Sequence, residues 1–296
     1  MSTTLLMFSI SFAGAVDFEV GAGAELVGST TPGAIDGGLG HAEIDAFLDL
    51  DVAAVVVDLD LLGPASVGVD RVGGELGVVY PEWAAVLATT GRWDLAAGFQ
   101  PLPAGAEAVD AWRNPLVTNT RGMSTLWLGG MLGARANVAL DAPVTPSMWG
   151  GVLAPTTVGL GEPVLGGGVQ FGYPDRVHGH VAVHTLPTLR DVRSHAALIA
   201  PLRDVVTLSG EVHAGYAKDL AFGVAGTAVA IPGGVVSPVV RVEHMGSLAV
   251  DAGVLAQPHE AFRVLASGRV EEGGWGLYAS VSLVDERPQP DLWALR

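Results

Sequence analysis

The acidic residues of this chain gather near its start. Ten of the 31 Asp and Glu residues fall between Asp17 and Asp60, and no lysine or arginine occurs before Arg71. Carboxylates concentrated in this way attract cations and repel anions. The formal charge is −16, with Lys218 as the single lysine, so phosphate backbones are repelled and nucleic acid is excluded as a partner. Electrostatic selection of cations is therefore the chemistry that these residues favour. The candidate set is Asp17, Glu19, Glu25, Glu43, Asp45, Asp49, Asp51, Asp58 and Asp60.

A second group of residues that could do chemistry is His178, His180 and His184. This spacing places all three imidazoles on one face of a strand, where they could bind Zn, Ni or Fe. The pattern resembles part of a cupin metal site, but Val181-Ala182-Val183 follow where a cupin would supply a glutamate. Polar histidines on the wet face of a strand are the favoured interpretation, so we expect no metal site and no cofactor.

Catalytic motifs are absent from the sequence. It contains no GxGxxG, no P-loop and no GxSxG, and its spacing assembles no Ser-His-acid set. The pairs Asp49/Asp51 and Asp58/Asp60 are what simple alternation produces. Because the chain has no cysteine, it has neither disulfides nor thiolate metal sites. We therefore expect a protein that is not an enzyme.

The elements that carry these residues follow a two-residue period. From Val16 to Leu26, apolar residues occupy one parity, while Asp, Glu and Gly occupy the other. The alternation continues from His41, and its parity changes near residues 52–54, which predicts a turn there. It recurs, more weakly, over residues 134–141, 177–184, 206–216 and 275–283, with Gly- and Pro-rich turn clusters between. The chain is therefore predicted to be all-β.

The apolar residues of these alternating segments need an environment other than water. Only 16% of the residues are charged and the mean hydropathy is +0.43, whereas soluble domains carry about 25% charged residues. Alternating segments of about 10 residues, separated by turns, are typical of transmembrane β-barrels whose apolar band meets lipid. We predict a single antiparallel transmembrane β-barrel of roughly 12–16 strands.

The chain is divided into three parts. Residues 1–15 contain a short apolar stretch followed by Ala13-Gly14-Ala15, which predicts a signal peptide without a basic start. Residues 16–284 form the expected barrel, and residues 285–296 a C-terminal tail. The long uncharged runs 142–161 and 220–240 contain prolines and turn residues, so neither is expected to be a spanning helix.

Four stretches carry a family resemblance: GHAEIDAFLDLDVAAVVVDLDLL, the region Trp83–Phe99, the region Ala111–Gly122, and Pro238–Met245. Together with the strands between them they resemble the porin-like β-barrel proteins of the Gram-negative outer membrane. The resemblance implies a bacterial outer-membrane location, contact with outer-membrane lipid, passive diffusion of small solutes and a homo-oligomer. The sequence departs from that family in its non-aromatic end, Arg296, and in its 19 aromatic residues, which make thin aromatic girdles.

Together these features predict a porin-like channel that prefers cationic or neutral solutes through an acidic lumen. Arg135, Arg241 and Arg263 are expected to form an opposing basic wall and to complete the pore lining. Two alternatives remain open. One is a non-conducting barrel that serves as an anchor, and the other is a soluble secreted β-sandwich or cupin-like metal protein.

Overall fold

The structure is a computed structural model. It describes residues 10–12, 16–50, 53–62, 79–102, 116, 120–126, 129–154, 161–173, 176–202, 205–217, 219–230, 235–259 and 262–283. The strands are β1 Ile10–Phe12, β2 Val16–Thr31, β3 Ala34–Asp49, β4 Ala54–Leu62, β5 Val79–Thr90, β6 Trp93–Pro101, β7 Gly130–Val138, β8 Val144–Ala154, β9 Pro163–Gly172, β10 His178–Leu186, β11 Asp191–Leu202, β12 Val206–Tyr216, β13 Leu220–Ala230, β14 Val236–Met245, β15 Ser247–His259, β16 Phe262–Glu271 and β17 Gly274–Leu283. Within these residues there is one short helix, α1, which spans Arg121–Leu126.

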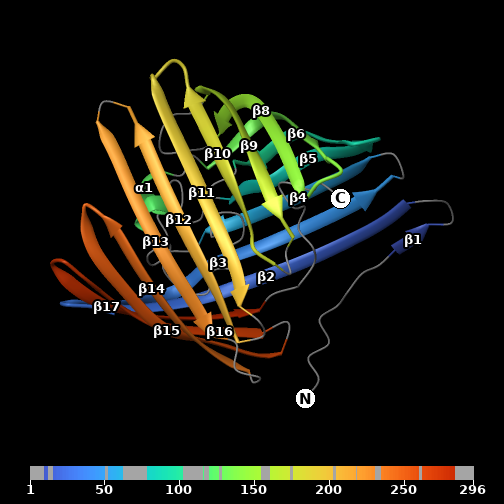
Figure 1. Cartoon of the computed structure of the whole chain (residues 1–296). Helices are drawn as coiled ribbons and strands as arrows, with labels where there is room; N and C mark the ends of the chain where they lie inside the picture. Colours follow the sequence, from blue (N-terminus) through green and yellow to red (C-terminus); the bar gives the residue numbers. More distant parts are fainter. Residues whose placement is uncertain are drawn as a thin grey trace.

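The strands close into a single antiparallel barrel (Figure 1). Each strand from β2 to β17 pairs with the next, and β17 returns to β2, with Leu277 opposite Thr30 and Leu283 opposite Ala24. Strand β1 pairs only with the start of β2 and is not part of the ring. The other sixteen of the seventeen described strands, β2 to β17, form the closed ring. The predicted all-β barrel is confirmed, at the upper end of the expected strand count. The β-sandwich alternative is wrong, because one sheet closes on itself instead of two sheets facing each other.

The predicted turns lie where the alternation changes. β3 ends at Asp49 and β4 begins at Ala54, and between them the Leu50 N–H donates to the Ala53 carbonyl at 2.9 Å. Strands β5 and β6 form the next hairpin. Gly91, with φ at +61°, lies in its turn, a conformation that glycine adopts without strain.

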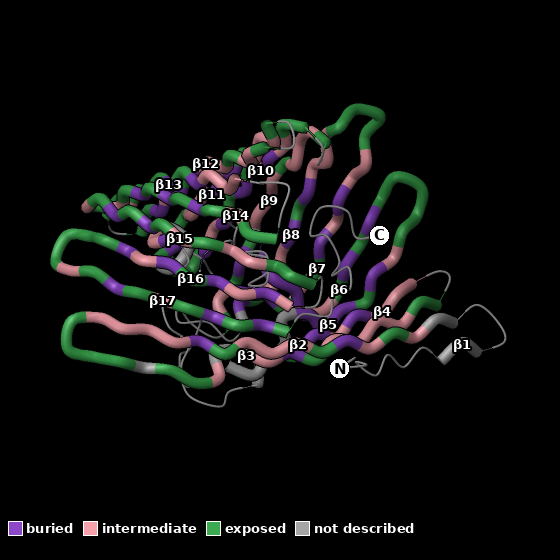
Figure 2. Tube along the Cα trace, turned by 90° about the horizontal axis from the view of Figure 1, so that it is seen from below, coloured by how far each residue is buried: buried purple, intermediate pink, exposed green. Residues whose placement is uncertain are grey.

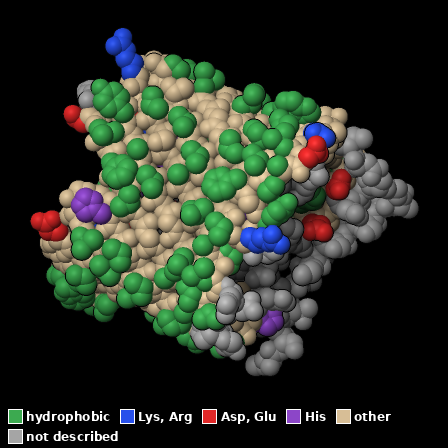
Figure 3. All heavy atoms as spheres, in the orientation of Figure 1, with side chains coloured by type: hydrophobic (Ala, Val, Ile, Leu, Met, Phe, Trp, Pro, Cys, Tyr) green, Lys and Arg blue, Asp and Glu red, His purple; other side chains and the backbone are tan. Residues whose placement is uncertain are grey.

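The apolar parity faces outward along the strands. In β17, Leu277 is 52% exposed and Val281 40%, whereas Ser280 and Ser282 are each 2% exposed. The same alternation of buried and exposed positions runs round the barrel (Figure 2). On the face shown in Figure 3, hydrophobic side chains are spread over the surface and the few charged ones lie towards its margins. This exterior suits a hydrocarbon solvent.

No helix in the described part of the chain is long and apolar enough to cross a membrane.

The exposed aromatic residues sort to the two ends of the barrel. Trp93 begins β6 and Tyr173 follows β9, so both lie at one end of the antiparallel array. Tyr216 ends β12, and Phe222 and Trp275 lie near the starts of β13 and β17, at the opposite end. Aromatic residues at both margins of an apolar band are typical of membrane barrels. The girdles are thin, as the composition predicted, but both are present.

Part of the interior is filled by apolar side chains. Trp83, Met131, Leu153 and Leu102 are fully buried and belong to one cluster on the inner faces of strands β4 to β10. Leu102 follows β6, and its N–H donates to the Gly129 carbonyl at 3.0 Å. This bond closes the base of the long β6–β7 connection, which carries α1.

The expected end segments lie mostly outside the described residues. Of the predicted signal peptide, only β1 is described, and the predicted tail at 285–296 lies beyond the last described residue, Leu283.

Candidate functional site in the barrel interior

Helix α1 folds into the barrel instead of over its rim. The helix belongs to the connection between β6 and β7, and it contacts β12, β13 and β14. In the closed order of sixteen strands, β13 is seven places from β6, so the helix reaches nearly to the far wall. The buried Leu126 side chain lies against Gly215 of β12. Helix α1 therefore lies inside the barrel and narrows the interior.

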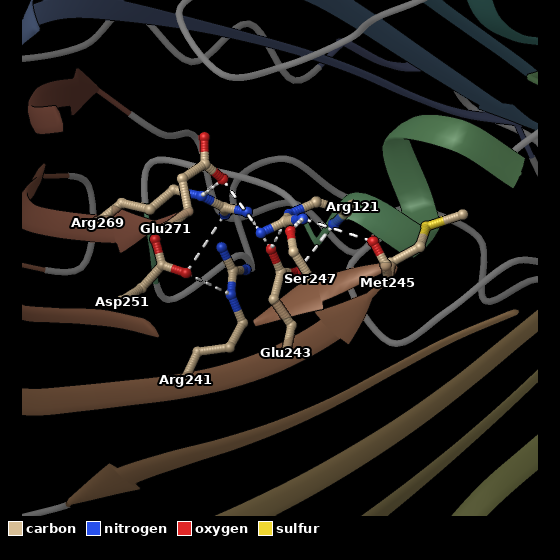
Figure 4. A network of polar contacts seen from close by, with 8 residues as sticks. All are labelled: Arg121, Arg241, Glu243, Met245, Ser247, Asp251, Arg269 and Glu271. Carbon is tan, nitrogen blue, oxygen red and sulfur yellow. Dashed lines mark hydrogen bonds and ion pairs between the residues drawn. The ribbon is translucent and has the colours of Figure 1, made fainter. Parts of the chain in front are cut away.

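The first residue of α1 is bound to three strands (Figure 4). The Arg121 backbone N–H donates to Glu243 Oε2 at 2.9 Å, and its guanidinium forms ion pairs with Glu243 at 3.4 Å and Glu271 at 3.2 Å. Arg121 Nη1 also donates to Ser247 Oγ at 2.7 Å. These contacts tie the helix to β14, β15 and β16.

The ion pairs extend into the wall behind α1. Arg269 is paired with Glu243, Asp251 and Glu271. Arg241 is paired with Asp251 at 3.2 Å, and both side chains are completely buried. Arg241 lies opposite Asp251, and Asp251 opposite Arg269, so the sign of charge alternates from strand to strand. With Arg121, the network contains equal numbers of arginines and carboxylates and has no net charge.

An arginine of β11 binds the last residue of α1. Arg193 Nη1 on β11 donates to the Leu126 carbonyl at 3.1 Å, and Arg193 is paired with Asp191 at 2.9 Å. A carboxylate at the helix start and a guanidinium at its end both complement the helix dipole. We call Glu243, Ser247, Glu271 and Arg193 the α1 clamp.

The acidic strands β2, β3 and β4 lie side by side. Their registers set Asp17 opposite Asp49, Asp45 opposite Asp58 and Glu43 opposite Asp60. Like charges directly opposite one another normally destabilise a sheet, so this concentration of carboxylates has a cost that a purely structural sheet would avoid. Glu43 and Asp58 are buried, Asp45 is half-buried and Asp49 is exposed.

Of the other predicted lumen carboxylates, only the side chains of Glu19 and Glu25 are described. Glu19 is exposed, and Glu25 is half-buried at a register shift, opposite the buried Ser282. Asp51 and the side chains of Asp17 and Asp60 lie outside the described part of the structure.

The three arginines expected to face the acidic strands are distributed round the barrel. Arg135, Arg241 and Arg263 are buried on β7, β14 and β16. Arg241 belongs to the network behind α1, and Arg135 donates to the Pro101 carbonyl at 2.7 Å. The strand diametrically opposite β3, eight places round the ring, is β11. That side of the wall carries histidines.

These histidines form a chain of contacts that we call the imidazole ladder (Trp149, His184, His195, His213 and Glu211). Trp149 Nε1 donates to His184 Nδ1 at 3.2 Å, and the His184 and His195 ring centroids are 5.4 Å apart. The Nδ1 atoms of His195 and His213 are 2.9 Å apart, and His213 Nε2 is 2.9 Å from Glu211 Oε2. All five side chains are buried.

The histidine spacing on β10 predicted only part of this ladder. His178, His180 and His184 share one face, as expected, but His184 meets Trp149 and His195 from other strands, while His178 Nδ1 contacts the Arg176 carbonyl. His195 and His213 follow the inward parity of β11 and β12, and only the register sets them opposite each other. Among the residues whose positions are described, no three His, Asp or Glu side chains are arranged to hold a metal ion.

A glycine on β9 makes the ladder continuous. Gly166 lies opposite Trp149 on one side and His184 on the other, and a Cβ at this position would clash with the Trp149 indole and the Val183 carbonyl. The missing side chain lets the indole reach across one strand to the imidazole.

Gly166→Ala is therefore expected to destabilise the barrel by about 1–3 kcal/mol, because an added methyl overpacks this contact. Gly210→Ala on β12 is the matched control, since a Cβ there meets nothing within 4 Å. Urea unfolding in detergent, followed by tryptophan fluorescence, measures both variants. Equal stability of the two would contradict the role given to Gly166.

The comparisons with known proteins agree with the fold. No protein-family model matches the sequence, and no curated protein is similar to it. Among solved structures, a Salmonella typhi OmpF complex with daunomycin has a TM-score of 0.67 at 10% identity, covering 93% of this chain and 99% of that one. An anion-selective porin from Comamonas acidovorans has a TM-score of 0.59 at 11% identity, covering 90% of this chain and 100% of that one. Outer-membrane expressed OmpT of Vibrio cholerae has a TM-score of 0.59 at 11% identity, with 93% and 99% covered. The chain has the sixteen-stranded fold of these barrels.

Proposed function

We propose that this chain, whose fold is that of the outer-membrane porins, is a bacterial outer-membrane channel for the passive diffusion of small solutes, with a preference for cations. The observation that carries the proposal is a closed barrel, apolar outside, whose interior contains a helix held at both ends by charged side chains. A non-conducting barrel that serves only as an anchor needs no charged interior, since apolar side chains alone can fill it. No catalytic activity is proposed.

The preference for cations is supported by the carboxylates of β2, β3 and β4. A carboxylate-lined wall raises the local cation concentration and repels anions. Arg241 and Arg269 do not offset this wall, because both are paired with carboxylates outside it, Arg241 with Asp251 and Arg269 with Asp251 and Glu243. Small cationic and neutral solutes are the proposed cargo, and the barrel is proposed to assemble as a homo-oligomer in outer-membrane lipid.

A non-conducting anchor is the second candidate, and the apolar cluster round Trp83 favours it, because that cluster fills part of the interior. Current through a planar bilayer distinguishes the two functions. The channel predicts discrete, ohmic conductance steps when the purified protein is added. The gel mobility of the same preparation should shift on boiling, as a closed barrel resists SDS until heated. A barrel that shows the mobility shift but never conducts would support the anchor.

A further inference from the structure

Gly21 of β2 leaves room for a carboxylate of the acidic strands. It is buried and lies directly opposite Asp45 of β3. A Cβ at Gly21 would lie only 2.8 Å from both Cγ and Oδ2 of Asp45, and closer still to Oδ1. The Asp45 carboxylate therefore lies across β2, in the space that any other residue at position 21 would fill with its own side chain.

The neighbour of Asp45 on its other side explains why this direction matters. On β4 the residue opposite Asp45 is Asp58, whose side chain is buried. Repulsion between two carboxylates weakens as they separate, and like charges directly opposite one another destabilise a sheet. Strands β2, β3 and β4 contain no lysine or arginine, so within them repulsion is relieved by side-chain placement alone. By lying over Gly21, the Asp45 carboxylate keeps its charge away from Asp58.

A side chain at position 21 would displace the carboxylate rather than the strand. Gly21 is not among the glycines with positive φ, so alanine fits its backbone conformation. At Gly133 and Gly151 an added Cβ would meet the backbone of the neighbouring strand, whereas at Gly21 the three nearest atoms belong to the end of one side chain. Asp45 would turn away from β2, which brings its charge nearer to Asp58.

We propose that Gly21 is a positioning residue for ion selection, which keeps Asp45 apart from Asp58 so that the two carboxylates act on the lumen as separate charges. Two carboxylates at close range hold a cation between them more tightly than either does alone, and such a pair presents less charge to passing ions. This role of Gly21 rests on the proposed preference for cations.

A double-variant cycle at Gly21 and Asp45, read as the reversal potential in a KCl gradient across a planar bilayer, tests this role. Asp45→Ala removes one charge and should lower the K⁺ to Cl⁻ permeability ratio about twofold. Gly21→Ala keeps every charge and should still lower the ratio about 1.5-fold. In the Asp45→Ala background, Gly21→Ala should have no further effect, because the added methyl then meets no carboxylate.

Gly37→Ala on β3 is the matched control, because a Cβ there makes only an ordinary contact, 3.4 Å from the Val27 carbonyl oxygen. This variant should keep the wild-type permeability ratio, and the boiling shift on gels shows whether each variant is folded. If Gly21→Ala does not fold, Asp45→Ala in the same chain should restore folding by removing the displaced carboxylate, and a failure to restore it would overturn the positioning role.

The outcomes separate this role from the proposed function. If Asp45→Ala lowers the ratio and Gly21→Ala does not, the role of Gly21 is wrong while cation selection by Asp45 stands. An equal fall on Gly21→Ala in both backgrounds would show that Gly21 acts through packing alone, which also overturns the proposal. If Asp45→Ala itself leaves the ratio unchanged, cation selection by Asp45 fails and the role of Gly21 fails with it.

Discussion

Reversing the charge of Asp45 and Asp49 together to lysine is expected to lower the K⁺ to Cl⁻ permeability ratio by about tenfold, since carboxylates and bases lining a pore select ions of opposite charge. The two residues lie on the same face of β3, where Asp49 is exposed and Asp45 half-buried, so the long lysine side chains can extend their charges to solvent from both positions. The buried Glu43 and Asp58 are unsuitable for this reason. The reversal potential in a KCl gradient measures the ratio.

Asp141→Lys is the control for that experiment. Asp141 lies in the β7–β8 connection, where its side chain is 85% exposed and pairs with Arg92. A charge at that position adds to the overall field of the protein but not to the wall of β2, β3 and β4. If the control moves the reversal potential as far as the pair on β3 does, the acidic strands are not the selecting element.

Asp251→Leu is expected to lower the free energy of unfolding by about 3–5 kcal/mol, because removing one member of a buried ion pair leaves the other charge buried without it. Arg241 and Asp251 are both fully buried. The double variant Arg241→Met with Asp251→Leu should recover most of that loss, since an apolar pair of similar volume replaces a buried ion pair at little cost. Arg269 keeps Glu243 and Glu271 in both variants.

The exposed pair Arg92 and Asp141 provides the comparison for this experiment. Their side chains are 61% and 85% exposed, so Arg92→Met should change stability by less than about 1 kcal/mol. Urea unfolding of the wild-type protein and these three variants in the same detergent measures the differences. A double variant no more stable than Asp251→Leu would show that the network behind α1 cannot be replaced by apolar packing.

Much of the fold could be predicted because a barrel repeats one rule. Lipid outside and polar groups inside force a two-residue period of apolar and polar residues. The alternation over Val16–Leu26 and the turn near residues 52–54 could therefore both be predicted from the sequence. Exact strand count was harder, since weakly alternating segments such as β9, with Gly166-Gly167-Gly168, carry almost no pattern.

The interior could be predicted only in part, because side-chain parity states which residues face inward but not which ones meet. Arg121 lies in a segment with no strand pattern, and nothing in its sequence indicates that it reaches Glu243, 122 residues away. Likewise, Asp251 meets Arg241 and Arg269 through register alone. Contacts of this kind depend on where the ring closes and on where the β6–β7 connection folds.

The pairing of β17 with β2 has a consequence for how the protein is made. The two strands that complete the ring are separated by nearly the whole sequence, with Leu277 opposite Thr30. Until the last hairpin has been synthesised, β2 has no closing partner, and the growing sheet keeps two unpaired edges of the kind that recruit other chains. Long-range pairing of this sort is also slow. We therefore expect the newly made chain to stay unfolded, bound by chaperones, until β17 has been synthesised. A truncation that removes only β17 should yield aggregate rather than a smaller barrel.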